Sequence, residues 1–214
     1  MLENFAVNPA DYSKPLRLYA DVDGVLSPFI KNEEALASHS PQQSVMVEKW
    51  TSGGYVTGLM DFQWDEFVAS KYVEWSKHPL VDFVWLTSWR KNAPQALDPL
   101  LGVDSLGYLP WDKKFTDYSQ TFKGVAVLED QKANPSSFIW LDDMANVTHD
   151  GEPLFVDWER MNEEFEYGTD DYYNREPVAA IDPSRFITIT PDRYEGLLPH
   201  EAAQVDNFIK SFVA

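Results

Sequence analysis

An apolar segment that ends abruptly in two carboxylates constrains the fold of this chain more than any other feature. Residues 16–26 read Leu-Arg-Leu-Tyr-Ala-Asp-Val-Asp-Gly-Val-Leu, and the apolar part suits a buried β-strand. Charges just past the C-terminal end of a parallel strand lie where open α/β sheets bind ligands, and Gly24 permits the tight turn that such a site needs. Asp21 and Asp23 therefore share one hard cation, divide the roles of nucleophile and proton donor, or form an ordinary acidic turn.

Two later segments repeat this arrangement of an apolar run that ends in polar side chains. Residues 84–88 read Val-Trp-Leu-Thr-Ser and end in hydroxyls, and residues 138–143 read Phe-Ile-Trp-Leu-Asp-Asp and end in paired acids. Lys123 lies between them, at the expected start of a helix. The alternation of strands and helices predicts a parallel sheet with helices on both faces. We therefore expect these strand ends and the lysine to gather around one divalent ion.

The order strand–DxD, strand–Thr, Lys, strand–DD resembles the four motifs of the haloacid dehalogenase (HAD) superfamily, whose members are mostly Mg-dependent phosphohydrolases. The resemblance covers residues 14–145 together with the C-terminal strand and helix. The phrases Leu-Thr-Ser-Trp and Trp-Leu-Asp-Asp are similar to those of small HAD domains of actinobacteria and their phages, a group related to the HAD domains of RNA-repair proteins. The resemblance implies an α/β fold with a Rossmann-like parallel sheet flanked by helices.

The resemblance also implies catalytic roles for the two acids of the first motif. Asp21 matches the nucleophile, whose attack on phosphorus gives an aspartyl-phosphate and splits one difficult step into two easier ones. Asp23 matches the general acid that protonates the leaving group and then activates water, a contribution of about 10²–10⁴ in rate. Dehalogenase members of the superfamily usually lack this second acid, so its presence favours phosphate chemistry.

The remaining matched positions would bind the phosphoryl group. Thr87 matches the hydroxyl that donates a hydrogen bond to a phosphoryl oxygen, with Ser88 as the rival position. Lys123 matches the lysine that neutralises phosphate charge and steadies the nucleophile. Lys113 and Lys114 compete for that role, and Lys123 is favoured because it precedes the helix that leads to the Asp-Asp strand.

The expected cofactor is Mg²⁺, which prefers oxygen ligands and usually retains water. The resemblance implies that the ion binds the carboxylate of Asp21, the backbone carbonyl of Asp23 and an acid of the Asp142–Asp143 pair. Of that pair, Asp142 is the expected direct ligand, and Asp143 is expected to act through water. Without a cation these carboxylates would repel one another and the incoming phosphate.

The chain is expected to form one HAD-like domain over residues 1–214. Two β-rich runs flank the Thr51-Ser-Gly-Gly turn, a hairpin signal within residues 27–60, where HAD proteins carry a flap or cap. The alternative is an ordinary edge hairpin. Residues 144–185 are rich in Asp, Glu and Tyr, and form either a partly ordered insert near the site or a solvated excursion.

Periodicity and helix capping signals predict the other elements. Asp61 is the expected N-cap of the first long helix, and Gly102 is the expected C-terminal stop of the next. Strands are expected at residues 15–21, 81–86, 105–109, 137–141 and 186–190. Helices are expected at residues 62–77, 92–101, 120–132 and 199–213.

Charge and composition limit the partners of the chain. The net charge of −18 disfavours general electrostatic binding of nucleic acid without excluding it, and a small phosphorylated substrate is compatible because a bound cation and a lysine reverse the field locally. The absence of cysteine excludes a thiol nucleophile and Cys-built zinc sites. No signal peptide or membrane-spanning run is visible, so a cytoplasmic protein without a membrane partner is expected, of open oligomeric state.

These features together favour a Mg-dependent phosphatase that hydrolyses a small phosphomonoester, such as a nucleotide, through an aspartyl-phosphate. Two alternatives stay open. The first is a phosphatase for nucleic-acid ends, which the repair-associated relatives suggest and the net charge disfavours. The second is a HAD-like domain that binds a ligand or a protein without turnover.

Overall fold

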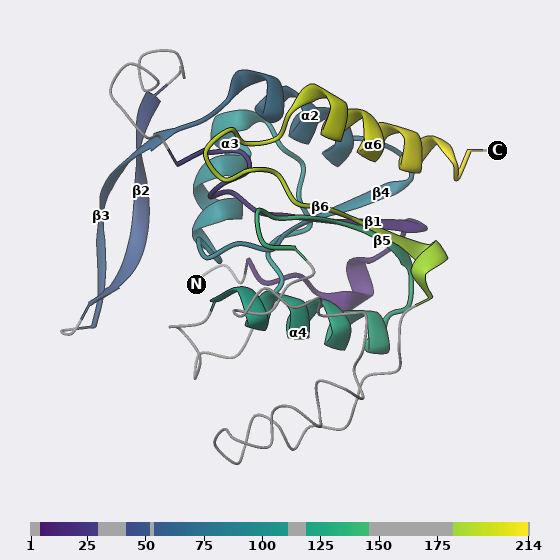
Figure 1. Cartoon of the computed structure of the whole chain (residues 1–214). Helices are drawn as coiled ribbons and strands as arrows, with labels where there is room; N and C mark the ends of the chain where they lie inside the picture. The colour runs from purple at the N-terminus through teal and green to yellow at the C-terminus, as the bar shows by residue number, and fades with distance from the viewer. Residues whose placement is uncertain (1–4, 30–41, 52–53, 111–118, 146–181, 214) are drawn as a thin grey trace, which may run out of the picture.

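A four-stranded parallel sheet forms the centre of the molecule (Figure 1). The computed structural model describes residues 5–29, 42–51, 54–110, 119–145 and 182–213. The sheet has the strand order β4-β1-β5-β6, which places β1 and β5 in the middle. The four strands are β1 (Leu16–Ala20), β4 (Val81–Trp85), β5 (Ser137–Leu141) and β6 (Phe186–Ile189).

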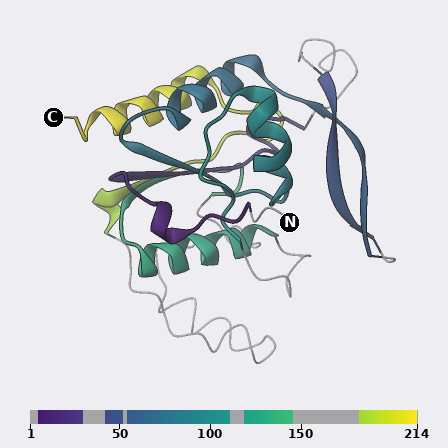
Figure 2. The same cartoon turned by 180° about the vertical axis from the view of Figure 1, so that it is seen from behind.

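Helices cover both faces of this sheet, as the alternating pattern predicts (Figures 1 and 2). One face carries α2 (Glu66–Ser76), α6 (Pro199–Lys210) and the α3 segment (Asp98–Leu101). The opposite face carries α4 (Ser119–Ala133). Because both faces are covered, every residue of β1 and β4 is buried, which explains why these strands are apolar except for Arg17 and Asp82. The predicted Rossmann-like α/β fold is confirmed.

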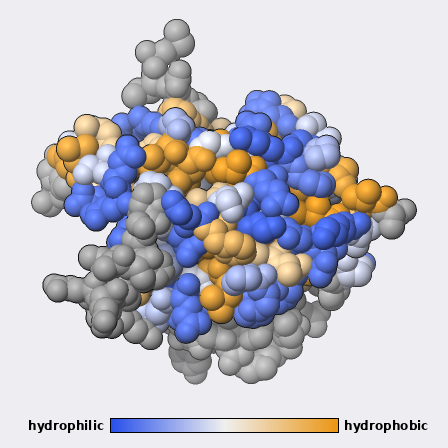
Figure 3. Space-filling view, turned by 90° about the horizontal axis from the view of Figure 1, so that it is seen from above, coloured by the Kyte–Doolittle hydropathy of each residue, from blue (hydrophilic) through white to orange (hydrophobic). Residues whose placement is uncertain are grey.

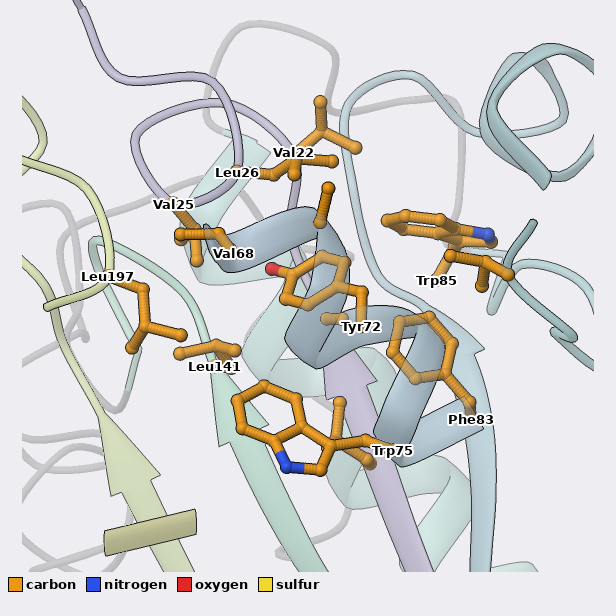
Figure 4. Close-up of a cluster of buried hydrophobic side chains, with 14 of the residues drawn as sticks. Val22, Val25, Leu26, Val68, Tyr72, Trp75, Phe83, Trp85, Leu141 and Leu197 are labelled. Atoms are coloured by element: carbon orange, nitrogen blue, oxygen red, sulfur yellow. The ribbon is translucent and has the colours of Figure 1, made fainter. Parts of the chain in front are cut away.

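Interlocked aromatic rings fill the core between the sheet and α2 (Figure 4). The ring of Tyr72 meets those of Phe83 and Trp85 edge-on, with centroid separations of 5.4 and 5.7 Å. Such edge-to-face pairs add about 0.5–1.5 kcal/mol beyond the burial of their area. The hydroxyl of Tyr72 donates a hydrogen bond of 2.7 Å to the backbone carbonyl of Asp21, so the core also supports the turn that follows β1.

A buried polar network attaches α4 to the opposite face of the sheet. Asp130 of α4 accepts hydrogen bonds from Arg17 and Tyr19 of β1, and Gln131 donates to the Tyr19 hydroxyl at 2.9 Å. Lys123 precedes Asp130 by seven residues, or two helical turns, so both face the sheet. Because Asp130 meets the beginning of β1, the network directs the start of α4 toward the C-terminal end of that strand.

A two-stranded antiparallel hairpin projects from the body of the molecule (Figure 1). It consists of β2 (Gln42–Thr51) and β3 (Gly54–Gln63), as the sequence predicts. Val45, Val47 and Phe62 are buried in the main core, and they attach the hairpin to it. The role of the hairpin as a flap or cap stays a prediction, and residues 30–41 of that predicted insert lie outside the described residues.

The prediction that Asp61 caps the first long helix is wrong. Asp61 lies within β3, where it accepts a hydrogen bond of 2.6 Å from the hydroxyl of Ser44 on β2. The helix α2 begins at Glu66, and its N-cap is Asp65, whose carboxylate accepts from the backbone N–H of Val68 at 3.0 Å. Cross-strand pairing continues β3 to Gln63 and thereby delays the helix by about one turn.

The other boundaries follow the prediction more closely. The strand predicted at residues 105–109 is reduced to bridges at Tyr108, which pairs with Ala6 and Trp85. The helix predicted at residues 92–101 begins as a π-helical turn, Ala93–Leu97, before α3, and it ends at Gly102 as predicted. Most of the acidic segment at residues 144–185 lies outside the described residues.

The surface of the described residues is mixed. Seen from above, hydrophilic residues separate the hydrophobic ones into patches (Figure 3). In this part of the chain, no helix combines the length and the apolar character that crossing a lipid bilayer requires. Large exposed hydrophobic side chains include Met46 and Leu59, which pair directly across the hairpin.

Replacing Tyr72 by Phe should lower the free energy of unfolding by about 1–3 kcal/mol, because the buried carbonyl of Asp21 loses its hydrogen bond while the ring packing is kept. Urea denaturation measures this change as a lower midpoint at an unchanged slope. A variant with the midpoint of the wild type would show that the hydroxyl does not support the turn.

Candidate functional site

The register of the sheet aligns the residues that follow β1 and β5. Ala20 pairs with Leu141, so Asp21 and Asp142 lie at the same level of the C-terminal edge. Side chains alternate between faces along a strand, and Tyr19 and Trp140 contact the core on the α4 side. Asp21 and Asp142, two residues further along, therefore point toward α4 as well.

Lys123 of α4 lies between these two carboxylates. Its Nζ atom is 2.5 Å from Oδ2 of Asp21 and 2.8 Å from Oδ2 of Asp142. All three side chains are almost completely buried, with exposed fractions of 4%, 3% and 0%. Buried ions are stabilised only when they are paired and hydrogen-bonded, so removal of one partner from such a group costs about 3–5 kcal/mol.

Burial and mutual repulsion shift the ionisation of this group. Burial raises the pKa of Asp21 to about 8; the Lys123 ammonium opposes this rise, and repulsion from Asp142 and Asp23 adds to it. Burial alone would lower the pKa of Lys123, but the attraction of Asp142 and Asp21 outweighs that effect and raises it. The lysine therefore stays an ammonium at neutral pH, whereas Asp21 holds its proton more tightly than an ordinary carboxyl group.

Asp143 adds a third carboxylate to this group. Carboxylate oxygens of Asp21, Asp142 and Asp143 all lie within 4.8 Å of one another. Arg193 forms an ion pair with the buried Oδ2 atom of Asp143, with Nη2 at 2.9 Å, although the geometry of this contact is not that of a hydrogen bond. Burial, followed by repulsion from Asp142, raises the pKa of Asp143 to about 6.

Gly24 is required by the close approach of the first turn to Asp143. Its φ angle is +75°, a conformation that L side chains rarely adopt. A Cβ atom at this position would lie 2.7 Å from the Asp143 carboxylate. The glycine therefore lets the turn after β1 and the turn after β5 meet at the acidic group.

The donor set fits a hard divalent cation. Three carboxylates lie together around one buried ammonium, and the guanidinium of Arg193 pairs with one of them, Asp143. Oxygen ligands of this kind suit Mg²⁺, which usually completes its coordination with water. In the described part of the chain, Asp21, Asp142 and Asp143 are the group that meets the geometry of such a site.

A second set of contacts surrounds Asp23. One carboxylate oxygen, Oδ2, accepts a hydrogen bond from the Ser88 hydroxyl at 3.1 Å, and the other, Oδ1, accepts one from Nε1 of Trp89 at 3.1 Å. Thr87 is completely buried beside them, and its hydroxyl accepts from the Trp89 backbone N–H at 3.3 Å. The loop after β4 therefore binds the carboxylate of Asp23, the second acid of the first motif.

The structure thus places the predicted residues in two adjoining groups. Lys123 joins Asp21 and Asp142 directly, and Asp143 completes the acidic group. The carboxylate of Asp23 is bound by Ser88 instead of belonging to that group, which leaves its backbone carbonyl as the predicted ligand atom. Lys113 and Lys114 lie outside the described residues.

The sequence did not predict three contacts of this site. Tyr72 supports the backbone of Asp21, Arg193 pairs with Asp143, and the indole of Trp89 donates to Asp23. Arg193 follows β6 at the same edge of the sheet, so the rule that identified the other strand ends would have found it. The other two contacts carry no sequence signal, because they depend on how distant elements pack.

Comparison with protein families gives one match. The family described as "HAD domain in Swiss Army Knife RNA repair proteins" matches residues 17–161, which is more than half of the chain. Searches among curated proteins and among solved structures found no match. The matched range contains the three strand-end motifs and Lys123.

Magnesium should raise the melting temperature of the wild-type protein, because an ion that binds only the folded state stabilises it by about 2.7 kcal/mol at one hundred times its dissociation constant. Asp143→Asn should lose most of this shift. Differential scanning calorimetry with and without MgCl₂ measures both effects.

Asp11→Asn provides the matched control, since Asp11 is exposed and distant in sequence from the strand ends. It should keep the full magnesium shift. An equal shift in Asp143→Asn and Asp11→Asn, or none in the wild type, would contradict a metal site at this edge.

Proposed function

The chain belongs to the HAD-domain family of Swiss Army Knife RNA repair proteins, and from this premise we propose that it is a Mg-dependent phosphatase of small phosphomonoesters, such as nucleotides. One observation carries the proposal. A buried carboxylate, Asp21, lies at the C-terminal edge of a parallel sheet, paired with Lys123 and within 4.8 Å of two further acids. This edge is where open α/β sheets bind ligands.

Asp21 is the proposed nucleophile. Its Oδ1 atom accepts from the backbone N–H of Val22 at 2.7 Å, and its Oδ2 atom accepts from Lys123, so the carboxylate is held in one orientation. Attack of a carboxylate oxygen on phosphorus forms an aspartyl-phosphate and breaks the ester P–O bond. Fixing the nucleophile in advance removes part of the entropic cost of this step.

Asp23 is the proposed acid and base. In the first step it gives its proton to the departing alkoxide, and in the second it takes a proton from the water that attacks phosphorus. The second step releases inorganic phosphate and restores the Asp21 carboxylate. Its carboxylate, two residues after Asp21 and beside Ser88, lies outside the group of acids proposed to hold the ion, so it is available for proton transfer.

Charge compensation is the remaining requirement. Lys123 is an ammonium held at the nucleophile, and Thr87 would offer its hydroxyl proton to a phosphoryl oxygen. Mg²⁺, when bound by Asp21, Asp142, Asp143 and the carbonyl of Asp23, would supply the positive charge that phosphoryl transfer needs. Without that charge, the acids would oppose the approach of a phosphate dianion.

A phosphatase for RNA ends is the second candidate, and the description of the matched family favours it. The net charge of −18 counts against it, because a long phosphate backbone would be repelled over much of the surface. A small phosphomonoester meets only the local field of Lys123 and the ion. Release of phosphate from 5′- or 3′-phosphorylated oligonucleotides, compared with mononucleotides at equal concentration, distinguishes the two substrates.

Asp21→Asn should abolish Mg-dependent hydrolysis of an aryl phosphate, because an amide is a far weaker nucleophile than a carboxylate. The expected loss in kcat is at least about 10³-fold. A colorimetric phosphate-release assay with and without EDTA measures it, and Asp11→Asn should keep the wild-type rate.

Three results would overturn the proposal. Activity that persists in Asp21→Asn would exclude this nucleophile, and activity that EDTA leaves intact would exclude the metal dependence. A wild-type protein that binds magnesium but releases no phosphate from a broad panel of phosphoesters would identify a binding domain without turnover.

A further inference from the structure

We propose that Trp89 is a positioning residue for Asp23, and that its indole determines which oxygen of that acid faces the substrate. The inference rests on the proposed phosphatase function and assigns a role that the sequence motif does not specify. It starts from the two hydrogen bonds that divide the Asp23 carboxylate between Trp89 and Ser88.

The two donors differ in their chemistry. The indole N–H of Trp89 can only donate, so Oδ1 of Asp23 has to remain an acceptor at every stage. The hydroxyl of Ser88 can donate to Oδ2 or, after rotation, accept from it. When Asp23 carries a proton, that proton therefore belongs on Oδ2, the oxygen that can release it to the leaving group.

Packing holds the indole in place for this task. Trp89 is buried to an exposed fraction of 9%, and its ring meets that of Phe62 edge-on at 5.0 Å. Phe62 in turn stacks on Trp64 at 5.4 Å. The backbone N–H of Trp89 donates to the Thr87 hydroxyl, so both its main chain and its side chain are fixed.

The same loop also contacts the hairpin. Asn92 donates to the backbone carbonyl of Glu48 at 3.0 Å and accepts from the Glu48 N–H at 2.9 Å. Lys91 pairs with the Glu48 carboxylate at 2.6 Å. Phe62 belongs to β3, so three contacts join the hairpin to the loop that carries Trp89. The orientation of Asp23 therefore depends on the position of the hairpin.

Substrates with different leaving groups test this role. Nitrophenolate departs without a proton, whereas a sugar or glycerol alkoxide needs one. Trp89→Phe keeps the aromatic packing and removes the N–H. We expect kcat/KM to fall about tenfold or more for glycerol phosphate and less than about threefold for 4-nitrophenyl phosphate. The value of kcat/KM depends only on the steps up to and including the first irreversible one. The later hydrolysis of the aspartyl-phosphate therefore does not affect the comparison.

Trp64→Phe is the matched control, because it makes the same change within the same aromatic group and Trp64 stacks on Phe62 without contacting Asp23. Its ratio of the two kcat/KM values should equal that of the wild type. A structural defect would lower kcat/KM for both substrates by the same factor. An unchanged ratio of the two kcat/KM values in Trp89→Phe would therefore overturn the inference.

A readout independent of activity uses the indole N–H resonance of Trp89, identified in ¹H–¹⁵N spectra by its absence from Trp89→Phe. It should move upfield in Asp23→Ala, where its acceptor is missing. An unmoved resonance would show that the hydrogen bond does not form in solution and would overturn the inference. A wild type without activity on either substrate would instead overturn the phosphatase function, even if this resonance moved.

Discussion

The buried contact of Lys123 with Asp21 and Asp142 is the interaction on which the rest of the site depends. Lys123 and Arg193 supply two positive charges beside three neighbouring carboxylates, so the group contains more acidic than basic side chains in a place from which water is largely excluded. Such an arrangement is costly in an apolar interior unless it is completed by a cation. This excess of acidic side chains is the physical reason to connect the site with magnesium and, through magnesium, with phosphate.

Two sets of contacts along the helix α4 hold Lys123 in that position. Near one end of α4, Asp130 is bound by Arg17 and Tyr19, which lie within β1, and toward the other, Lys123 reaches Asp21 beyond the end of the same strand. The strand therefore sets the distance between the two polar groups. A shift of α4 by one turn would break the contacts of Asp130 and those of Lys123 at once. Stability and site geometry are coupled here, because the network that attaches the helix also aligns the lysine.

The hairpin is the element that this fold adds to a simple α/β sheet, and it contacts the site. Part of it is buried in the main core, and it contacts the loop after β4 through Phe62 and Glu48. If Trp89 orients Asp23, contacts made by the exposed strands of the hairpin are transmitted to the acid and base of the reaction. Substrate selection and proton transfer would then share one structural element.

The sequence by itself determined the sheet, the hairpin and the acidic strand ends, because the change from an apolar run to Asp21 or to Asp142 is a local feature that period and polarity reveal. It did not determine where α2 begins, since Asp61 and Asp65 carry the same capping signal and only the pairing of β3 with β2 separates them. The sequence and its family resemblance placed Lys123 at this site, but tertiary structure alone decided that Arg193 faces Asp143 and that an indole binds Asp23. Each of these contacts joins residues far apart in the chain, and their distance is set by helix docking and strand register, which no local pattern encodes.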